Sequence, residues 1–400
     1  MLKIKNIVKI KNIKKISEIK IKNLCTFVIL LVINTNNINI QMNFLYIITI
    51  IKTLGGMTMK FKKIVALSSA LLVASMSLVG CSNKTNNDES NNKTIKVGMV
   101  ADVGGINDES FNQSAWEGLQ QAEKELGIEA KVIESRQASE YLGNIETLAD
   151  QGMDLIIGVG FTMVEDIKTQ AANYPDISFA IVDETYEEIP SNVTPIVFRA
   201  NEAAYLTGLI AGKMTKTNEV GFIGGMDNPV VNQFEYGYKA GVVAANDKAN
   251  VKAQYAGTFG DAAKGKSIAN QMYANNIDTI LSAAGGTGIG AIESAKEQNK
   301  YAIGVDRDQS DLAPENILTS ALKKVNVGVY ETVKAFIEGE EIGGKERVYG
   351  LKEDGVGIPE STKNLVPQDI IDYVNEMAEK VKNGEIKVPA TKDEYEAMNK

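Results

Sequence analysis

The stretch IKVGMVADVGGINDESFNQSAWEGLQQAEKELGIEAKVI, residues 95–133, decides the fold class. Its β-branched opening at 95–100 predicts a strand, and a second strand is predicted at 130–133. Between them lies a predicted helix at 110–126, which Gly127 ends. Four apolar residues recur along it at helical spacing: Ala115, Leu119, Ala122 and Leu126. A strand, a helix and a strand in succession predict a parallel sheet with a right-handed crossover.

The same alternation continues along the chain. Strands are expected at 154–159, 179–182, 220–223, 252–256, 279–283, 302–305 and 317–322, and near 347–351. Helices are expected at 139–150, 164–172, 202–214, 233–245, 264–274, 289–298 and 325–338, and near 367–382. In the helix at 139–150, the apolar face would consist of Leu142, Ile145 and Leu148. The pattern restarts near 198–201, which predicts an α/β fold of two doubly wound parallel-sheet lobes with a hinge.

The elements after residue 317 suggest that the chain recrosses between the lobes. The expected first lobe comprises residues 94–198 with about 325–346, and the second comprises 199–324 with about 347–400. Ligands of open α/β sheets bind beyond the carboxyl ends of the strands. Two such lobes that face one another therefore predict a cleft lined by the loops that follow the strands.

The segment MKFKKIVALSSALLVASMSLVGC, residues 59–81, has the pattern of an export signal, because basic residues precede an apolar run that ends in small residues. Its end, LVGC, resembles a bacterial lipobox. That resemblance implies a lipoprotein signal peptide at 59–80, cleavage before Cys81 and lipidation of the Cys81 thiol. The polar composition that follows predicts a flexible tether at 81–93. The alternative is a short transmembrane helix that buries Cys81.

Residues 1–58 are dominated by Ile, Asn and Lys and show no alternation of apolar and polar faces. This composition is typical of translated AT-rich non-coding DNA, so we interpret the segment as upstream sequence with the true start at Met59 or Met57. The alternative is a genuine extension with membrane segments near 24–33 and 44–51, both too short to span comfortably. A peptide from residues 1–56 in the native protein would defeat the first interpretation.

Charge and residue types exclude several functional classes. The net charge is −9, and residues 1–58 hold nine Lys against one Glu, so the rest of the chain is more acidic than the total suggests. An acidic body argues against a nucleic-acid partner, but not against an uncharged nucleoside. The chain has no His, and its two cysteines, Cys25 and Cys81, form no Cys-x-x-Cys motif. We therefore expect no metal site, no cofactor and no catalysis.

Two aromatic residues in loops after strands are the first candidates for ligand contact. Phe111 lies beside polar residues in ADVGGINDESFN, residues 101–112, and Phe259 lies among small and polar residues in GTFGDAAKGK, residues 257–266. With one ring from each lobe, the pair could enclose a planar heterocycle, because stacking a base on an aromatic ring is favourable. The alternative for Phe259 is an ordinary surface hydrophobe.

Polar candidates follow several strands. Asp102 and Asp108 offer carboxylate acceptors in the first loop, and Asp183 offers a third. Asp306 ends another strand, where it could accept hydrogen bonds from two hydroxyl groups of a sugar, and Lys323 could donate to the same sugar. Taken one at a time, each could instead be a solvated charge, a salt bridge or a helix cap.

A glycine-rich loop, AAGGTGIG at 283–290, only partly matches a dinucleotide-binding fingerprint, because the full spacing and the acidic partner are missing. We expect these glycines to let the backbone approach a ligand and to start a helix.

Four of these stretches resemble the basic membrane protein family of type 1 periplasmic binding proteins, near its purine nucleoside receptor lipoproteins. They are DVGGINDESFNQSAWEG (102–118), GTFGDAAKGK (257–266), GVDRDQ (304–309) and TSALKK (319–324). The resemblance implies a bilobal Venus-flytrap receptor, lipid-anchored on the extracytoplasmic face, that delivers a purine nucleoside of the guanosine, inosine or adenosine class to an ABC permease. A soluble body on a tether needs no partner surface, so we also expect a monomer.

The same resemblance implies roles for individual residues. Phe111 and Phe259 would clamp the base. Its polar edge would be read by Asn112, Asp183 and Asp102. The ribose would be held by Asp306, Lys323 and the backbone near Gly285. The alternatives are a sugar or signalling-molecule receptor of the same fold, a nucleoside hydrolase that uses the cleft carboxylates, and a surface adhesin.

Overall fold

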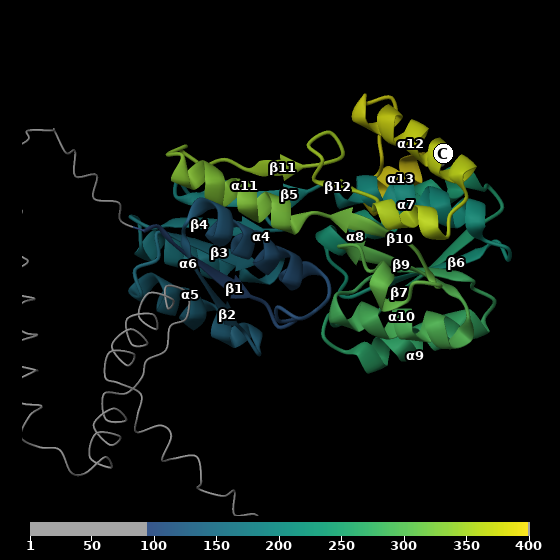
Figure 1. The fold of residues 1–400 in the computed structure, drawn as a ribbon, viewed down its shortest axis with the longest axis horizontal. Coiled ribbons are helices and arrows are strands. Elements are labelled where there is room, and N and C mark those ends of the chain that lie inside the picture. The colour runs from purple at the N-terminus through teal and green to yellow at the C-terminus, as the bar shows by residue number, and fades with distance from the viewer. Residues whose placement is uncertain (1–93, 399–400) are drawn as a thin grey trace, which may run out of the picture. The chain divides into compact units, whose positions relative to one another are not determined.

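The computed structural model describes residues 94–398 (Figure 1). These residues form two six-stranded sheets, each with helices on both faces. The expectation of an α/β fold with two doubly wound lobes is confirmed. The sequence regions 1–58, 59–80 and 81–93, with the proposed lipidation site Cys81, lie outside the described residues.

The first sheet has the order β11-β5-β4-β3-β1-β2, and every pair in it is parallel. Its strands are β1 (Lys96–Ala101), β2 (Glu129–Glu134), β3 (Leu155–Val159), β4 (Ser178–Val182), β5 (Val193–Phe198) and β11 (Arg347–Tyr349). The strand β3 is buried along its whole length, as a central strand covered by helices on both faces should be. The helices of this lobe are α4 (Phe111–Leu126), α5 (Tyr141–Asp150), α6 (Val164–Asn173) and α11 (Val325–Ile337).

The second sheet repeats the topology in the order β12-β10-β9-β8-β6-β7, and only β12 pairs antiparallel. Its strands are β6 (Glu219–Gly224), β7 (Asn250–Tyr255), β8 (Thr279–Ala283), β9 (Tyr301–Asp306), β10 (Ile317–Lys323) and β12 (Val356–Gly357). The helices of this lobe are α7 (Ala200–Met214), α8 (Pro229–Ala245), α9 (Ala262–Ala274) and α10 (Gly286–Gln298), followed by α12 (Gln368–Lys382) and α13 (Lys392–Met398).

Local sequence signals set the helix ends. Gly127 ends α4 with φ of 72°, a left-handed conformation that glycine adopts without strain. The side chain of Asn228 accepts hydrogen bonds from Val230 N and Val231 N, and Pro229 follows as the first residue of α8. The helices α7 and α8 pack backbone against backbone, because a Cβ on Gly241 would lie 2.1 Å from Tyr205 O. Asn228 and Pro229 thus define the start of α8, and Gly241 allows its close packing on α7.

Three differences from expectation have physical reasons. The strand β5 was not expected, because Pro195 interrupts its β-branched run; this proline lies outside the part of β5 that pairs with β11. The segment Arg347–Tyr349, expected in the second lobe, pairs with β5 in the first sheet, so the chain recrosses after it. Leu142 is 40% exposed, because the buried face of α5 runs from Tyr141 through Ile145 and Leu148.

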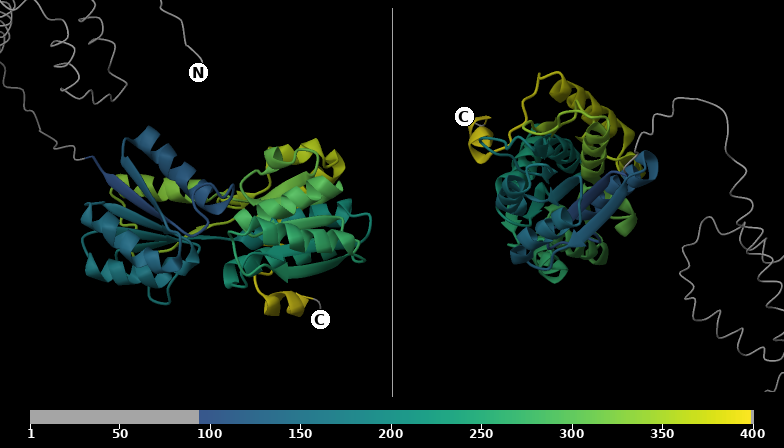
Figure 2. Two further views of the ribbon diagram at one scale, coloured as in Figure 1. Left: turned by 90° about the horizontal axis from the view of Figure 1, so that it is seen from below. Right: turned by 90° about the vertical axis from the view of Figure 1, so that its left-hand side faces the viewer.

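The chain crosses between the lobes three times, after β5, after β10 and after β11, and the crossings run side by side (Figure 2). Backbone hydrogen bonds tie them together. Arg199 N donates to Tyr349 O at 2.9 Å, and Lys324 N donates to Gly355 O at 2.8 Å. Three bonded crossings form the hinge expected of such a fold. Within residues 94–398, no helix is long and apolar enough to cross a membrane.

Candidate ligand-binding cleft

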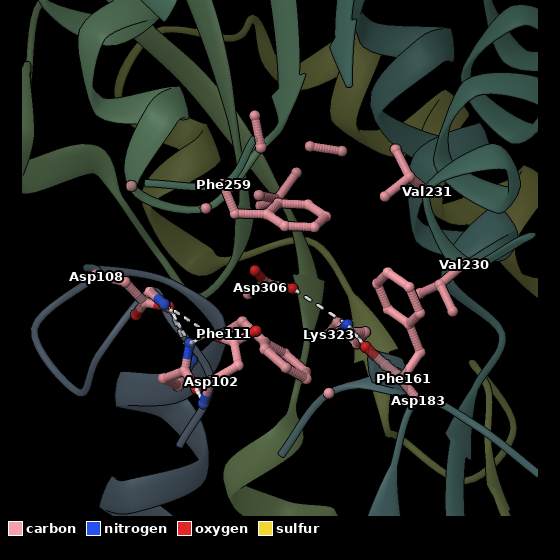
Figure 3. Close-up of a pocket in the computed structure, with 18 of the residues that line it drawn as sticks. Asp102, Asp108, Phe111, Phe161, Asp183, Val230, Val231, Phe259, Asp306 and Lys323 are labelled. Carbon is pink, nitrogen blue, oxygen red and sulfur yellow. Dashed lines mark hydrogen bonds and ion pairs between the residues drawn. The ribbon is translucent and has the colours of Figure 1, made fainter. Parts of the chain in front are cut away.

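A cavity with about 610 Å³ of unoccupied space, part of it at the mouth, lies where the carboxyl ends of the two sheets face each other (Figure 3). Eight residues proposed from sequence all line it: Asp102, Phe111, Asn112, Asp183, Phe259, Gly285, Asp306 and Lys323. The first four come from the first lobe and the other four from the second, so both lobes are needed to complete the cavity.

The two aromatic rings reach the cavity from different lobes. Phe111 is the first residue of α4, and Phe259 lies in the loop between β7 and α9. Both side chains are half-buried, and Figure 3 shows them on opposite sides of the cavity. The ring of Phe259 lies against the backbone of Gly225, where a Cβ would approach it to 2.2 Å, so only glycine leaves room for this ring position. Neither ring points into the interior of its lobe.

A buried charged trio occupies one side of the cavity. Lys323 Nζ makes an ion pair with Asp183, which comes from the other lobe, and lies 3.6 Å from Asp306 Oδ1. All three side chains are less than one-tenth exposed. Asp183 and Asp306 both adopt left-handed backbone conformations, with φ of 67° and 65°. Such strain at non-glycine residues is characteristic of functional sites.

The charges of this trio support one another. Burial opposes the charged form of Lys323, but Asp183 and Asp306 outweigh it and hold the pKa of the amine above its ordinary value. Burial raises the pKa of Asp306, and Lys323 and the hydroxyl of Ser110, which donates to Asp306, oppose that rise. The amine is therefore positively charged at neutral pH.

Aromatic rings surround the amine of Lys323. Its Nζ lies 4.4 Å from the ring centroid of Phe111, 5.8 Å from that of Phe234 and 5.9 Å from that of Phe198. A cation within about 6 Å of an aromatic face is attracted to it. These contacts fix the amine at the cavity wall and tie the charged trio to the Phe111 side of the clamp.

An acidic cluster lies at the start of α4. The side chain of Asn112 donates to Asp102 Oδ1 at 2.8 Å and to Asp108 Oδ2 at 3.0 Å, and its oxygen accepts from Asp102 N. Asp108 also accepts from the backbone N–H groups of Ser110, Asn112 and Gln113, which is how it caps α4. The amide of Asn112 is thus engaged within the first lobe and fixes the orientation of Asp102.

Asp102 is the titratable group of this cluster. Burial raises its pKa to about 6, against the hydrogen bonds from Gly104 and Asn112, which lower it. A carboxyl group with a pKa in this range changes its protonation state near neutral pH. Asp102 can therefore present either an acceptor or a donor to a ligand.

Several lining residues were not proposed from sequence. They are Gly104, Gly160, Phe161, Val230, Val231, Phe234, Ala283, Ala284 and Val305. Gly286, one of the glycines expected to approach a ligand, and Asp108, noted from sequence only as an acceptor, also line the cavity. Phe161 follows β3, and Val230 and Val231 begin α8. Both loops follow strands, so they are among the loops expected to line the cleft, although these residues were not singled out. Among residues 94–398, no cluster of His, Cys, Asp and Glu could hold a metal ion.

Comparisons with known proteins agree with this geometry. The family model Bmp, described as ABC transporter substrate-binding protein PnrA-like, matches residues 95–392. A solute-binding protein of an ABC transporter system from Aeropyrum pernix K1 has a similar structure, with a TM-score of 0.70 and 28% identity over 76% of this chain and 96% of that one. One from Conexibacter woesei has a TM-score of 0.63 and 25% identity, over 74% of this chain and 99% of that one.

Curated relatives cover most of the chain. Basic membrane protein A of Borreliella burgdorferi is 38% identical, over 82% of this chain and 97% of the relative. The ABC transporter nucleoside-binding protein BmpA of Lactococcus lactis is 37% identical, over 82% of this chain and 99% of the relative. The CD4+ T-cell-stimulating antigen of Listeria innocua is 38% identical, over 82% and 99%. The chain belongs to the Bmp family of PnrA-like ABC-transporter substrate-binding proteins, a family of binding proteins rather than enzymes.

Proposed function

We propose that this protein captures purine nucleosides in the cavity between its lobes and delivers them to an ABC permease. The observation that carries the proposal is the pair of phenylalanine rings, Phe111 and Phe259, which line one cavity from different lobes. A relative named as a nucleoside-binding protein, 37% identical, supports the same ligand class. No chemical step is needed for this function, because closure around the ligand and recognition of the closed form are sufficient.

The two rings would hold the base. A purine has two flat faces, and stacking on an aromatic side chain contributes about 1–3 kcal/mol per base by alanine substitution. Asp102 and Asp183 would meet the polar edge of the base, since carboxylates accept hydrogen bonds from ring N–H groups and exocyclic amines. Asn112 would act mainly by holding Asp102, because its amide already bonds to Asp102 and Asp108.

Two members of the charged trio, Asp306 and Lys323, would hold the ribose. Asp306 can accept from two hydroxyl groups, Lys323 can donate to a sugar oxygen, and the backbone near Gly285 borders the same cavity. Ser110 and Lys323 already compensate the buried carboxylate of Asp306. A hydroxyl group that replaces Ser110 as donor would leave that carboxylate equally well paired, so entry of a ribose would carry little penalty from an uncompensated charge.

The proposed setting is the extracytoplasmic face of the cell membrane. Lipidation of Cys81 after removal of residues 59–80 would anchor the protein, and the polar residues 81–93 would let a monomeric body move beside its permease. More than one acyl chain is needed for stable anchoring. Mass spectrometry of the membrane-extracted protein tests this directly, because it would find Cys81 as the lipid-modified N-terminus.

The ligand is tested by native purification followed by mass spectrometry of whatever small molecule is released on denaturation. Calorimetric titration with guanosine, inosine, adenosine, the matching free bases, ribose and simple sugars then ranks the candidates. We expect a purine nucleoside to be released and to bind more tightly than its base or sugar alone. Preferred binding of a sugar would support the alternative receptor function, and free base among the products would support a hydrolase.

A further inference from the structure

A second set of interlobe contacts lies beside the cavity, centred on Arg307. This residue follows β9 in the second lobe. Its NH1 donates to Glu109 Oε2 at 2.7 Å and its NH2 donates to Glu117 Oε1 at 3.0 Å. Both glutamates belong to the first lobe, Glu109 to the loop before α4 and Glu117 to α4 itself. One guanidinium group therefore spans the cleft and pairs with two carboxylates on the far side.

Gln309 adds a neutral bond to the same contact. Its Nε2 donates to the backbone oxygen of Glu109 at 2.8 Å, and its Oε1 accepts from Val305 N within the second lobe. Gln309 is 4% exposed, so this bond is shielded from water. Side chains two positions apart in the loop after β9 thus both hold Glu109.

The Arg307 contacts are separate from the proposed ligand site. Within residues 94–398, the lining of the cavity includes neither Arg307 nor Glu109 nor Glu117. Their side chains are 28%, 43% and 40% exposed, so the two glutamates lie at the surface and Arg307 is partly buried. None of the three lines the cavity, but together they join the two lobes.

We propose that Arg307, Glu109 and Glu117 form an interlobe clasp that sets how long the protein retains its ligand without touching that ligand. This inference rests on the proposed capture of a nucleoside in the cavity. Contacts made only when the lobes are closed stabilise the closed state relative to the open one. A ligand enclosed by both lobes can leave only after the lobes separate, so the clasp acts on the dissociation rate.

The clasp is tested with the full chain and with inosine and guanosine as probes. Trp116, the single tryptophan, precedes Glu117 on α4 and gives a fluorescence signal for stopped-flow measurement of dissociation. We expect Arg307→Met to speed dissociation by about 3–10-fold, Arg307→Lys to have a smaller effect because lysine lacks the planar fork, and association to change by less than about 2-fold.

The control is Lys266→Met. Lys266 is also paired with two glutamates, Glu293 and Glu297, but all three lie in the second lobe, on α9 and α10. Its removal should leave dissociation unchanged. Glu117→Gln, which is distant in sequence from Asp306, separates loss of the clasp from disturbance of the neighbouring ligand residue. In the double variant Arg307→Met/Glu117→Gln, dissociation should be no faster than in Arg307→Met alone.

Small-angle X-ray scattering of the ligand-free proteins measures how far the lobes are open. It therefore tests the clasp independently of nucleoside binding. If the wild type binds no nucleoside, the proposed function fails, and the clasp is then decided by scattering alone. A larger radius of gyration for Arg307→Met than for wild type and Lys266→Met supports the clasp. Equal dissociation rates and equal radii for Arg307→Met and wild type, or equal effects from Lys266→Met, would overturn it.

Discussion

The first and second sheets follow the same strand order, so residues at matching strand ends can be compared directly. The strands β4 and β9 lead to matching carboxylates, Asp183 and Asp306, with nearly the same left-handed φ. The strands β5 and β10 end differently, at Phe198 and at Lys323. One cation thus serves two equivalent acids, one from each lobe. This difference at one pair of strand ends helps to make an asymmetric site on a symmetric scaffold.

The loops that precede the matching helices α4 and α8 also differ between the lobes. The loop before α4, residues 102–110, carries the acidic cluster, whereas the loop before α8, residues 225–228, is short and ends in the capping Asn228. The first lobe therefore supplies the acidic cluster and one ring, while the second supplies the amine, the other ring and apolar residues such as Val231. Because neither lobe holds a complete site, closure of the hinge is part of binding.

The largest expected effect comes from removing the shared cation. Lys323→Met would leave the carboxylates of Asp183 and Asp306 buried without a cation, which is expected to cost about 3–5 kcal/mol of folding stability and to abolish measurable nucleoside binding. Chemical denaturation and calorimetry measure the two effects. The neighbouring Lys324, whose pair with Asp354 is solvent-exposed, is the matched control. Lys324→Met should cost less than about 1 kcal/mol, and similar losses from both variants would contradict the shared-cation account.

The aromatic clamp, Phe111 and Phe259, compares the two lobes directly, because each lobe contributes one ring. Phe111→Ala and Phe259→Ala are each expected to weaken nucleoside binding by about 1–3 kcal/mol, with similar losses for the free base, since the rings would contact only the base. Phe259→Leu keeps apolar volume without a ring and separates stacking from burial. Unchanged affinity in both alanine variants, measured by calorimetry, would remove the clamp.

The two equivalent acids should differ in what they recognise. Asp306→Asn is expected to weaken nucleoside binding by about 1.5–3 kcal/mol, because a charged acceptor for the ribose hydroxyl groups is lost. The binding of the free base should change little. Asp183→Asn is expected to weaken the binding of the nucleoside and of the free base alike. Calorimetry with inosine and hypoxanthine distinguishes them. If both variants changed nucleoside and base in the same proportion, the two acids would have equivalent roles, against this account.

The smallest expected effect concerns Asp102 and stability. Its pKa of about 6 in the folded protein exceeds the ordinary value of 3.8, so the folded state binds the proton more tightly than the unfolded state. Stability from this group therefore falls as pH rises from about 4 to 6, and the loss is complete above that window. Asp102→Asn removes the charge, so it should stabilise the ligand-free protein by about 1–2 kcal/mol at pH 8 and by little near pH 4.

Denaturant unfolding across this pH range measures the difference, with Asp354→Asn as the exposed control. A constant gap between Asp102→Asn and wild type from pH 4 to pH 8 would show that the gain does not come from the titration of Asp102. A loss of stability at pH 8 would mean that the charge is favourable in the folded protein.

The sequence predicted the fold well because its signals are local. Continuous apolar runs and helical spacing identified most elements. The chemistry of the strand-following loops, together with the resemblance to the basic membrane protein family, identified eight residues that line one cavity. The strand β5 was not predicted because Pro195 breaks its pattern. The pairing of Arg347–Tyr349 with β5 was not predicted because the sequence of a short strand does not indicate which strand it pairs with. The clasp could not be predicted either, because Arg307 and Glu117 are far apart in the sequence and meet only through tertiary contact.

The most direct test is a crystal structure of the protein with inosine. The account predicts that the purine ring lies between Phe111 and Phe259 and that the ribose hydroxyl groups lie at Asp306 and Lys323. It also predicts that the guanidinium of Arg307 pairs with the opposite lobe. Inosine bound elsewhere, or bound in the cavity with either ring turned away from the base, would contradict the claim that the two lobes grip a nucleoside between them.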